Sequence, residues 1–253
     1  MGKSVNDIRV MYGIMAKQKP EPKNLHALQI DVLPTGTLTP LAKTSADLLD
    51  RVSEFLQQSF AIRRTQPPYF DKSARLWQEM MSIDGGKGVA EIALPGEGEN
   101  AWKEYAKEKL TKTSSIHPYL SWALIGAGLF KPSSKRRTEI ESIIEQGDTL
   151  LDDYLANRVL IFPVYHTGAP VHGALYKEIF SLRKGFLKYM PFTGYANVWG
   201  LPSLVISVGT DEHHMPISVQ LMSRNGNEDL LFQLGELLER EFGGYSRCRK
   251  LDE

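Results

Sequence analysis

Cysteine is almost absent from this sequence, since Cys248 is the single one among 253 residues. A disulfide within the chain needs two cysteines, so a disulfide framework is excluded, and this favours a reducing compartment such as the cytoplasm. An excess of one charge is also missing, because 30 Lys and Arg residues are balanced by 30 Asp and Glu residues. Nucleic-acid binding needs a basic face. We therefore expect a cytoplasmic protein that binds no nucleic acid.

Long hydrophobic runs are missing as well. No apolar stretch approaches the ~18–20 residues that a membrane-spanning helix needs. The first ten residues, MGKSVNDIRV, lack the apolar core of a secretory signal. The sequence thus predicts no membrane span.

The usual nucleophile motifs give no catalytic site. Gly-x-Ser-x-Gly is absent, which excludes the nucleophile elbow of α/β-hydrolases. Paired serines occur at Ser114–Ser115 and Ser133–Ser134, and neither pair lies in a glycine-rich turn that directs backbone N–H groups at an oxyanion. We interpret both pairs as helix caps or loop residues.

Cofactor and metal motifs are also weak. The segment Asp84–Gly88 (DGGKG) precedes a predicted strand, whereas a phosphate cradle follows a strand and opens a helix, so we interpret it as a turn. His166 and His172 are separated by six positions, and His213 and His214 are adjacent. Zinc sites need three or four ligands at definite spacings. We expect no cofactor and no metal ion.

Periodic apolar residues predict alternating helices and strands, and hence a single α/β domain over residues 1–253. The predicted helices are Ser4–Ala16, Thr44–Phe60, Lys72–Ser82, Asn100–Leu110, Pro118–Leu129, Thr138–Asn157 and a last helix capped by Asn227 and ended by Gly243. The predicted strands are Leu25–Leu33, Gly88–Leu94, Val159–Val164, Ser203–Gly209 and Pro216–Ser223. The continuous apolar runs Val159–Val164 and Ser203–Gly209 are typical of strands buried on both faces.

The last third of the chain carries a specific set of motifs. Their order is Thr, Asn, Gly-x-Pro, an apolar strand ending in Gly, Met-Pro, Gln and a Glu-capped helix. The residues are Thr193, Asn197, Gly200, Pro202, Gly209, Met215, Pro216, Gln220 and Glu228. This pattern resembles the C-terminal module of the amidase-signature family, most strongly over residues 191–242. The resemblance implies a mixed β-sheet covered by helices on both faces.

Two upstream segments extend the resemblance. Arg158–Pro163 (RVLIFP) stands where the family has an Asp-x-Leu-x-x-Pro strand, with Arg in place of Asp. Gly2–Asp7 (GKSVND) is similar to the family's Gly-Pro-Met-x-Arg-Ser-Val-x-Asp segment, in which the Met is internal. In the family, the catalytic lysine and the two catalytic serines precede this segment. The resemblance therefore implies a C-terminal portion without the catalytic triad.

The activity that the resemblance implies is hydrolysis of amide C–N bonds, possible only when the N-terminal catalytic part is present. The fatty-acid amide hydrolase branch is one candidate, because Tyr119–Phe130 and Phe186–Phe192 are rich in apolar and aromatic residues. The substrate-binding candidates lie in a predicted loop before the Ser203–Gly209 strand: Phe192, Thr193, Tyr195, Asn197 and Trp199. The alternative interpretation makes their aromatic rings part of the hydrophobic core.

Two functional hypotheses follow. In the first, a complementing N-terminal chain or segment supplies the catalytic residues, and this chain is inactive alone. In the second, the chain is a non-catalytic domain that binds a small ligand or another protein. Removing part of a sheet exposes an edge strand and an apolar face, which favours association with a partner or with a second copy.

Overall fold

A mixed sheet forms the centre of the computed structural model, which describes residues 2–16, 20–36, 40–94, 96, 98–171, 173–174 and 185–246. The five strands have the order β2-β1-β3-β5-β4. Their bounds are β1 Gln29–Val32, β2 Ala61–Arg64, β3 Arg158–Pro163, β4 Ser203–Thr210 and β5 Pro216–Met222. Strands β2, β1 and β3 are parallel, whereas β5 is antiparallel to both β3 and β4. The predicted α/β class with a mixed sheet is confirmed.

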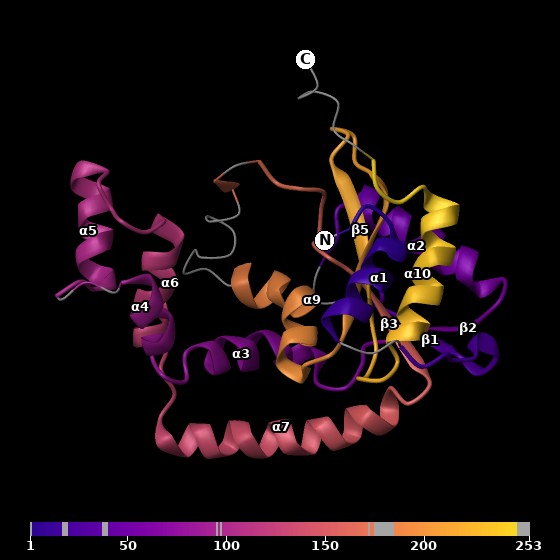
Figure 1. Cartoon of the computed structure of the whole chain (residues 1–253), viewed down its shortest axis with the longest axis horizontal. Coiled ribbons are helices and arrows are strands. Elements are labelled where there is room, and N and C mark those ends of the chain that lie inside the picture. Colours follow the sequence, from indigo (N-terminus) through magenta and orange to yellow (C-terminus); the bar gives the residue numbers. More distant parts are fainter. Residues whose placement is uncertain are drawn as a thin grey trace.

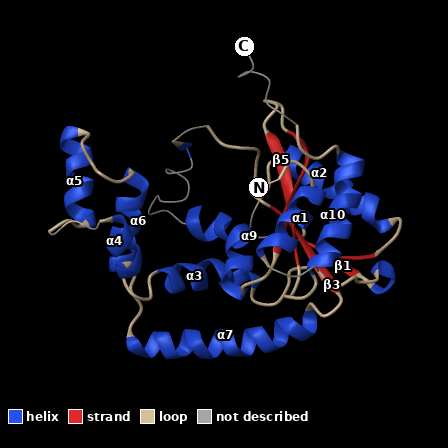
Figure 2. Ribbon diagram, in the orientation of Figure 1, coloured by secondary structure: helices blue, strands red, loops and turns tan. Residues whose placement is uncertain are grey.

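Helices cover both faces of this sheet (Figures 1 and 2). One layer contains α1 (Val5–Met15), α2 (Lys43–Gln57) and α10 (Glu228–Phe242). The other contains α3 (Phe70–Met81), α7 (Ser134–Tyr154) and α9 (Gly185–Trp199). Each layer closes its own hydrophobic core against the sheet. None of the helices in the described ranges has the length and hydrophobicity that crossing a membrane requires.

Strand β3 is the most deeply buried element. Val159, Leu160, Ile161 and Phe162 each have 0% exposure. Because successive strand residues point to opposite faces, Val159 and Ile161 enter the core under α2 and α10, whereas Leu160 and Phe162 enter the core under α3 and α9. The prediction of a strand buried on both faces is confirmed for this segment.

A group of three helices extends away from the sheet: α4 (Lys87–Ala93), α5 (Ala101–Thr111) and α6 (Pro118–Leu129). Figure 1 shows it at the end of α3 and α7, far from the strands. Glu104 of α5 organises its loop, because its carboxylate accepts hydrogen bonds from the Ser115 amide at 2.7 Å and the Ser114 hydroxyl at 3.1 Å. The hydrogen bond from Lys107, followed by these bonds, lowers the pKa of Glu104 to about 2. The interpretation of Ser114–Ser115 as loop residues is confirmed.

The strand predicted for Gly88–Leu94 is wrong, because Gly88–Ala93 belongs to helix α4 and Leu94 is its C-cap. Gly85 and Gly86 have positive φ angles of 73° and 77°, a conformation that glycine adopts without steric cost. The Asp84 carboxylate then accepts hydrogen bonds from the Gly86 and Gly88 amides at 2.7 and 2.9 Å. A turn at Asp84–Gly88 is confirmed, and it starts a helix.

Three other segments differ from the sequence predictions. A 3-10 turn, η1 (Leu25–Ala27), precedes β1, so the predicted Leu25–Leu33 strand is shortened to Gln29–Val32. Strand β2 was not predicted, since its four residues carry no alternating pattern. Asn227 is the N-cap residue of α10, as predicted, but its side chain makes no capping hydrogen bond; the side-chain amide donates instead to the Leu155 and Ala156 carbonyls.

The contact between α7 and α9 requires a glycine. A Cβ atom added at Gly147 would lie 2.2 Å from the Trp199 ring, far inside van der Waals contact. Glycine weakens a helix by about 1 kcal/mol relative to alanine, so packing against Trp199 outweighs helix propensity here.

We therefore expect Gly147→Ala to destabilise the protein, although alanine is the better helix former. Overpacking of a filled core costs about 1–3 kcal/mol, which exceeds the propensity gain. Chemical denaturation of both proteins measures the difference. Gly126→Ala in α6, where the added Cβ meets no atom within 4 Å, is the matched control and should be neutral or stabilising. A stability gain for Gly147→Ala would contradict this packing.

Candidate functional site

The five substrate-binding candidates lie in helix α9, which ends at Trp199. The predicted loop before β4 is therefore wrong. The sequence has Pro191 inside this helix, which argues against helix at the sequence level. The spacing of Phe192, Tyr195 and Trp199 at intervals of three and four nevertheless places the rings on one helical face, and burial of that face outweighs the proline.

Three of the candidates lie in the core under α3 and α7. Phe192 and Tyr195 have 0% exposure and Trp199 has 6%. The Tyr195 ring lies 5.6 Å from that of Phe162, and its hydroxyl donates a hydrogen bond to the Pro68 carbonyl at 2.9 Å. Burial raises the pKa of Tyr195, so the phenol stays neutral. These three side chains hold α9 against the sheet.

Thr193 and Asn197 lie on a different side of α9. Thr193 is half-buried and Asn197 is exposed. The Asn197 amide donates to the Thr193 carbonyl at 3.2 Å, one helical turn away. The helix therefore separates the predicted set into a buried aromatic part and an accessible polar part.

An aromatic cluster lies where β3 ends. Tyr165 and His166 lie two and three residues after the last residue of β3, and their ring centroids are 5.7 and 3.9 Å from that of Tyr189 in α9. The His166 and Tyr189 rings are nearly parallel, at 17°. The Ala42 amide, at the start of α2, donates to the His166 carbonyl at 2.7 Å. In α/β sheets, ligands bind outside the carboxyl ends of parallel strands, so this cluster is a candidate binding surface.

Sequence reasoning considered His166 only as a metal ligand. The signal that could have found the cluster was its position just after a predicted buried strand.

No group of three or more His, Cys, Asp or Glu side chains that could hold a metal lies in the described part of the chain. His172 and Cys248 are outside the described residues. His213 and His214 form an exposed turn, in which Asp211 accepts from the His213 amide at 2.9 Å.

A buried polar network on the sheet was missed by the sequence analysis. Asp31 of β1 has 1% exposure and accepts two hydrogen bonds from Arg63, at 2.9 and 2.8 Å. Arg158 lies 3.3 Å from the same carboxylate, and the Tyr154 hydroxyl donates to it. Burial, together with this hydrogen bond, raises the pKa of Tyr154 to about 12. The network joins β2, β1, β3 and α7, which is a structural role.

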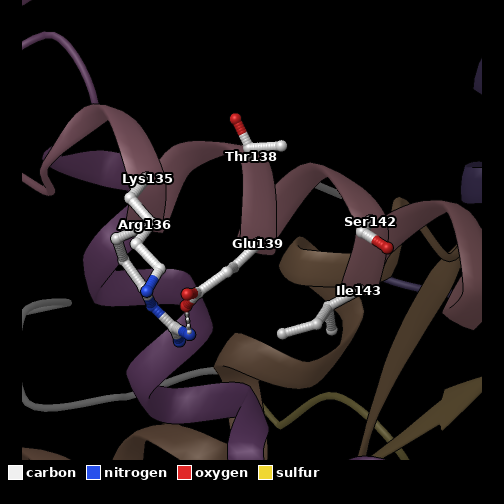
Figure 3. A pocket seen from close by; sticks show the side chains of 6 residues that line it. All are labelled: Lys135, Arg136, Thr138, Glu139, Ser142 and Ile143. Atoms are coloured by element: carbon white, nitrogen blue, oxygen red, sulfur yellow. Dashed lines mark hydrogen bonds and ion pairs between the residues drawn. The ribbon is translucent and has the colours of Figure 1, made fainter.

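Two surface grooves lie elsewhere. One, of about 610 Å³, follows α7 and is lined by Lys135, Arg136, Thr138, Glu139, Ser142 and Ile143. Figure 3 shows the Arg136 guanidinium directed at the Glu139 carboxylate, 3.0 Å away, while Thr138 points away from this pair. Arg136 also contacts Glu79 at 2.7 Å. Its charge is therefore already compensated within the chain.

The second groove, of about 650 Å³, is lined by Pro22, Lys23, Asn24, Leu25, His26, Ser59, Phe60 and Gln233.

Both grooves lack a serine with a hydrogen-bonded base. In the part of the chain that the structure describes, no serine hydroxyl is hydrogen-bonded to a lysine amine or a histidine ring. Ser133 caps α7 through the Arg136 amide at 3.2 Å. The predicted reading of Ser133 as a helix cap is confirmed.

Comparison with known proteins identifies the fold. The family model described as Amidase matches residues 60–232. Fatty-acid amide hydrolase 2-B of Danio rerio is 24% identical over 220 residues, covering 82% of this chain and 39% of that protein. The chain therefore spans well under half the length of this relative.

Solved structures show the same arrangement of elements. A crystal structure of an amidase has a TM-score of 0.67 at 19% identity, covering 95% of this chain and 51% of that one. The structure of 6-aminohexanoate cyclic dimer hydrolase has a TM-score of 0.68 at 17% identity, covering 99% of this chain and 56% of that one. At these identities, the likeness concerns the fold.

The division of α9 into a buried and an accessible side predicts different effects of two substitutions. Tyr195→Phe removes the hydrogen bond from the buried Tyr195 hydroxyl to the half-buried Pro68 carbonyl, which should lower the free energy of unfolding by about 0.5–1.5 kcal/mol. Asn197→Ala removes an exposed side chain and should change it by less than about 0.5 kcal/mol. Thermal or urea denaturation measures both. An equal loss in the two variants would show that Asn197 also belongs to the core.

Proposed function

The chain belongs to the amidase family, and from this premise we propose that it serves the hydrolysis of amide C–N bonds as the C-terminal portion of an amidase fold. The observation that carries this proposal is the family match over residues 60–232. It is supported by a fold that accounts for 95% of this chain but only 51% of a solved amidase.

We infer that the nucleophile comes from outside these 253 residues. The family's glycine-rich double-serine motif does not occur in the sequence, and the serine hydroxyls that the structure places in hydrogen bonds contact backbone groups, carboxylates or side-chain amides. Removing one member of a catalytic triad costs orders of magnitude in rate, because its members act as a unit. The chain alone is then inactive, and a complementing catalytic part of the amidase fold is its partner.

The contribution of this chain in the proposal is a wall of the substrate pocket. Phe192, Tyr195 and Trp199 fix α9 from inside the core, and the accessible Thr193 and Asn197 supply polar groups. The aromatic cluster of Tyr165, His166 and Tyr189 adds an apolar surface at the carboxyl end of β3. An apolar wall with few polar groups fits a fatty amide, the substrate class in the name of the Danio rerio relative.

We propose that this hydrolysis takes place in the cytoplasm. The single cysteine is consistent with a reducing compartment. A domain that binds an amide or a protein without catalysis is the second candidate, supported by the two hydrophobic cores that the chain closes by itself.

Steady-state hydrolysis of a fatty amide and an anilide tests the proposal. We expect no turnover by this chain alone. Turnover should appear when it is co-expressed with the stretch of Danio rerio fatty-acid amide hydrolase 2-B that the match omits. The difference should be roughly 10⁴-fold or more, because the complete triad is present only in the complex.

A pair of asparagine variants tests the wall. Within the active complex, Asn197→Ala should raise KM, while Asn225→Ala, also exposed, should leave KM unchanged. Turnover by the chain alone would contradict the proposal. A well-formed complex without turnover would instead favour the non-catalytic candidate.

A further inference from the structure

Helix α6 holds the three outlying helices together. Its Leu124 is buried, and a Cβ atom added at Gly86, in the turn that begins α4, would lie 3.2 Å from the Leu124 side chain. On another side of α6, the Trp122 ring lies 5.8 Å from the Tyr105 ring of α5. Figure 1 shows the three helices together, away from the strands. The order of this group therefore depends on α6.

The first turn of α6 is held by one histidine. His117 is the N-cap residue, and its Nδ1 accepts a hydrogen bond from the Tyr119 amide at 3.2 Å. The His117 carbonyl accepts from the Leu120 and Ser121 amides at 2.9 and 3.3 Å. Pro118, at the first helical position, has no N–H to donate. All three amide donors of this turn therefore have an acceptor on His117.

A histidine cap responds to pH, whereas a cap through a hydroxyl or amide oxygen does not. The oxygens of Ser4, Asn100 and Ser133 cap α1, α5 and α7. Neutral imidazole has one acceptor nitrogen, but protonated imidazole has only donors. Histidine gains its proton between about pH 8 and pH 5. Protonation also places a positive charge at the helix N-terminus, where the helix dipole disfavours cations.

The charged groups around this cap keep their charge through that range. On α5 they form two ion pairs, Lys107 with Glu104 and Lys112 with Glu108. The hydrogen bond from Lys107 and those from the loop lower the pKa of Glu104 to about 2. In the turn before α4, the Gly88 and Gly86 amides hold the pKa of Asp84 below its ordinary value. A change between pH 7.5 and pH 5.5 is therefore assigned to the imidazole.

The imidazole is open to solvent protons and fixed in place. His117 is exposed, so its ring gains a proton without any opening of the fold. The Tyr119 ring contacts it edge to face, with the centroids 4.7 Å apart and the planes at 82°. This contact keeps Nδ1 directed at the Tyr119 amide while the ring is neutral.

We propose that His117 is a pH-sensitive cap whose protonation loosens the first turn of α6. As the pH falls, the Tyr119 amide loses the Nδ1 acceptor, and the first turn opens more often. The contact between Trp122 and Tyr105 then weakens, so α5 and α6 separate more readily in mild acid. This inference does not depend on the function proposed above.

Hydrogen exchange followed by NMR on the whole chain tests the proposal. Protection factors of the Leu120 and Ser121 amides correct for the intrinsic effect of pH on exchange. We expect them to be roughly 5-fold lower at pH 5.5 than at pH 7.5, because the cap is lost and the charge opposes the dipole. Protection of the Ile161 amide in β3 is the internal reference and should not change.

Two matched variants identify the titrating group. In His117→Asn, the asparagine oxygen accepts a hydrogen bond at both pH values, so protection should be the same at pH 7.5 and pH 5.5. His26→Asn replaces another exposed histidine, in the turn before β1, and should keep the 5-fold loss.

A loss in the wild type and in His26→Asn that is absent from His117→Asn supports the proposal. Wild-type protection that does not change with pH overturns it. An equal loss in His117→Asn also overturns it, because another group then titrates. So does a fall of the same size at Ile161, which would make the effect global.

Discussion

The structure depends on the burial of β3 between two strands and two helical layers. Its backbone is paired with β1 on one side and β5 on the other, and its side chains enter both cores. Side chains from distant segments fix its ends, since the Ser223 hydroxyl donates to the Arg158 carbonyl at 2.7 Å and the Gln220 amide donates to the Pro163 carbonyl at 3.3 Å. The aromatic cluster and α9 are positioned by this strand. Any binding surface at the carboxyl end of the sheet therefore depends on it.

Much of the fold could be predicted from the sequence where local pattern and tertiary burial agree. Strand β3, helix α1 with its Ser4 cap, and helix α10 with Gly243 at its end are such cases. Helix α9 was missed because Pro191 argues locally for a loop, while the contacts that favour a helix come from Phe162 and Pro68, far away in the sequence. Strand β2 was missed because its four residues form a strand only through pairing with β1.

The site was less predictable than the fold. The family resemblance predicted five substrate-binding residues in one segment. Helix α9 places three of them in the core and two on its accessible side. The Asp31 network could not be seen, because Arg63 and Tyr154 lie 32 and 123 positions away in the chain. A run such as Ser203–Thr210 does not itself distinguish a buried strand from an edge strand that another segment covers. Ser203–Gly209 was predicted to be buried on both faces, and this is wrong, because β4 is an edge strand in the described ranges and its Val205 is 54% exposed.

The central claim is that this chain completes an amidase without supplying its nucleophile. Labelling the co-expressed complex with a fluorophosphonate probe, followed by mass spectrometry of the modified peptide, tests this claim most directly. The account predicts a single modified serine on the complementing chain and no label on these 253 residues. A label on a serine of this chain, formed also when the chain is alone, would contradict the account and place the active site within it.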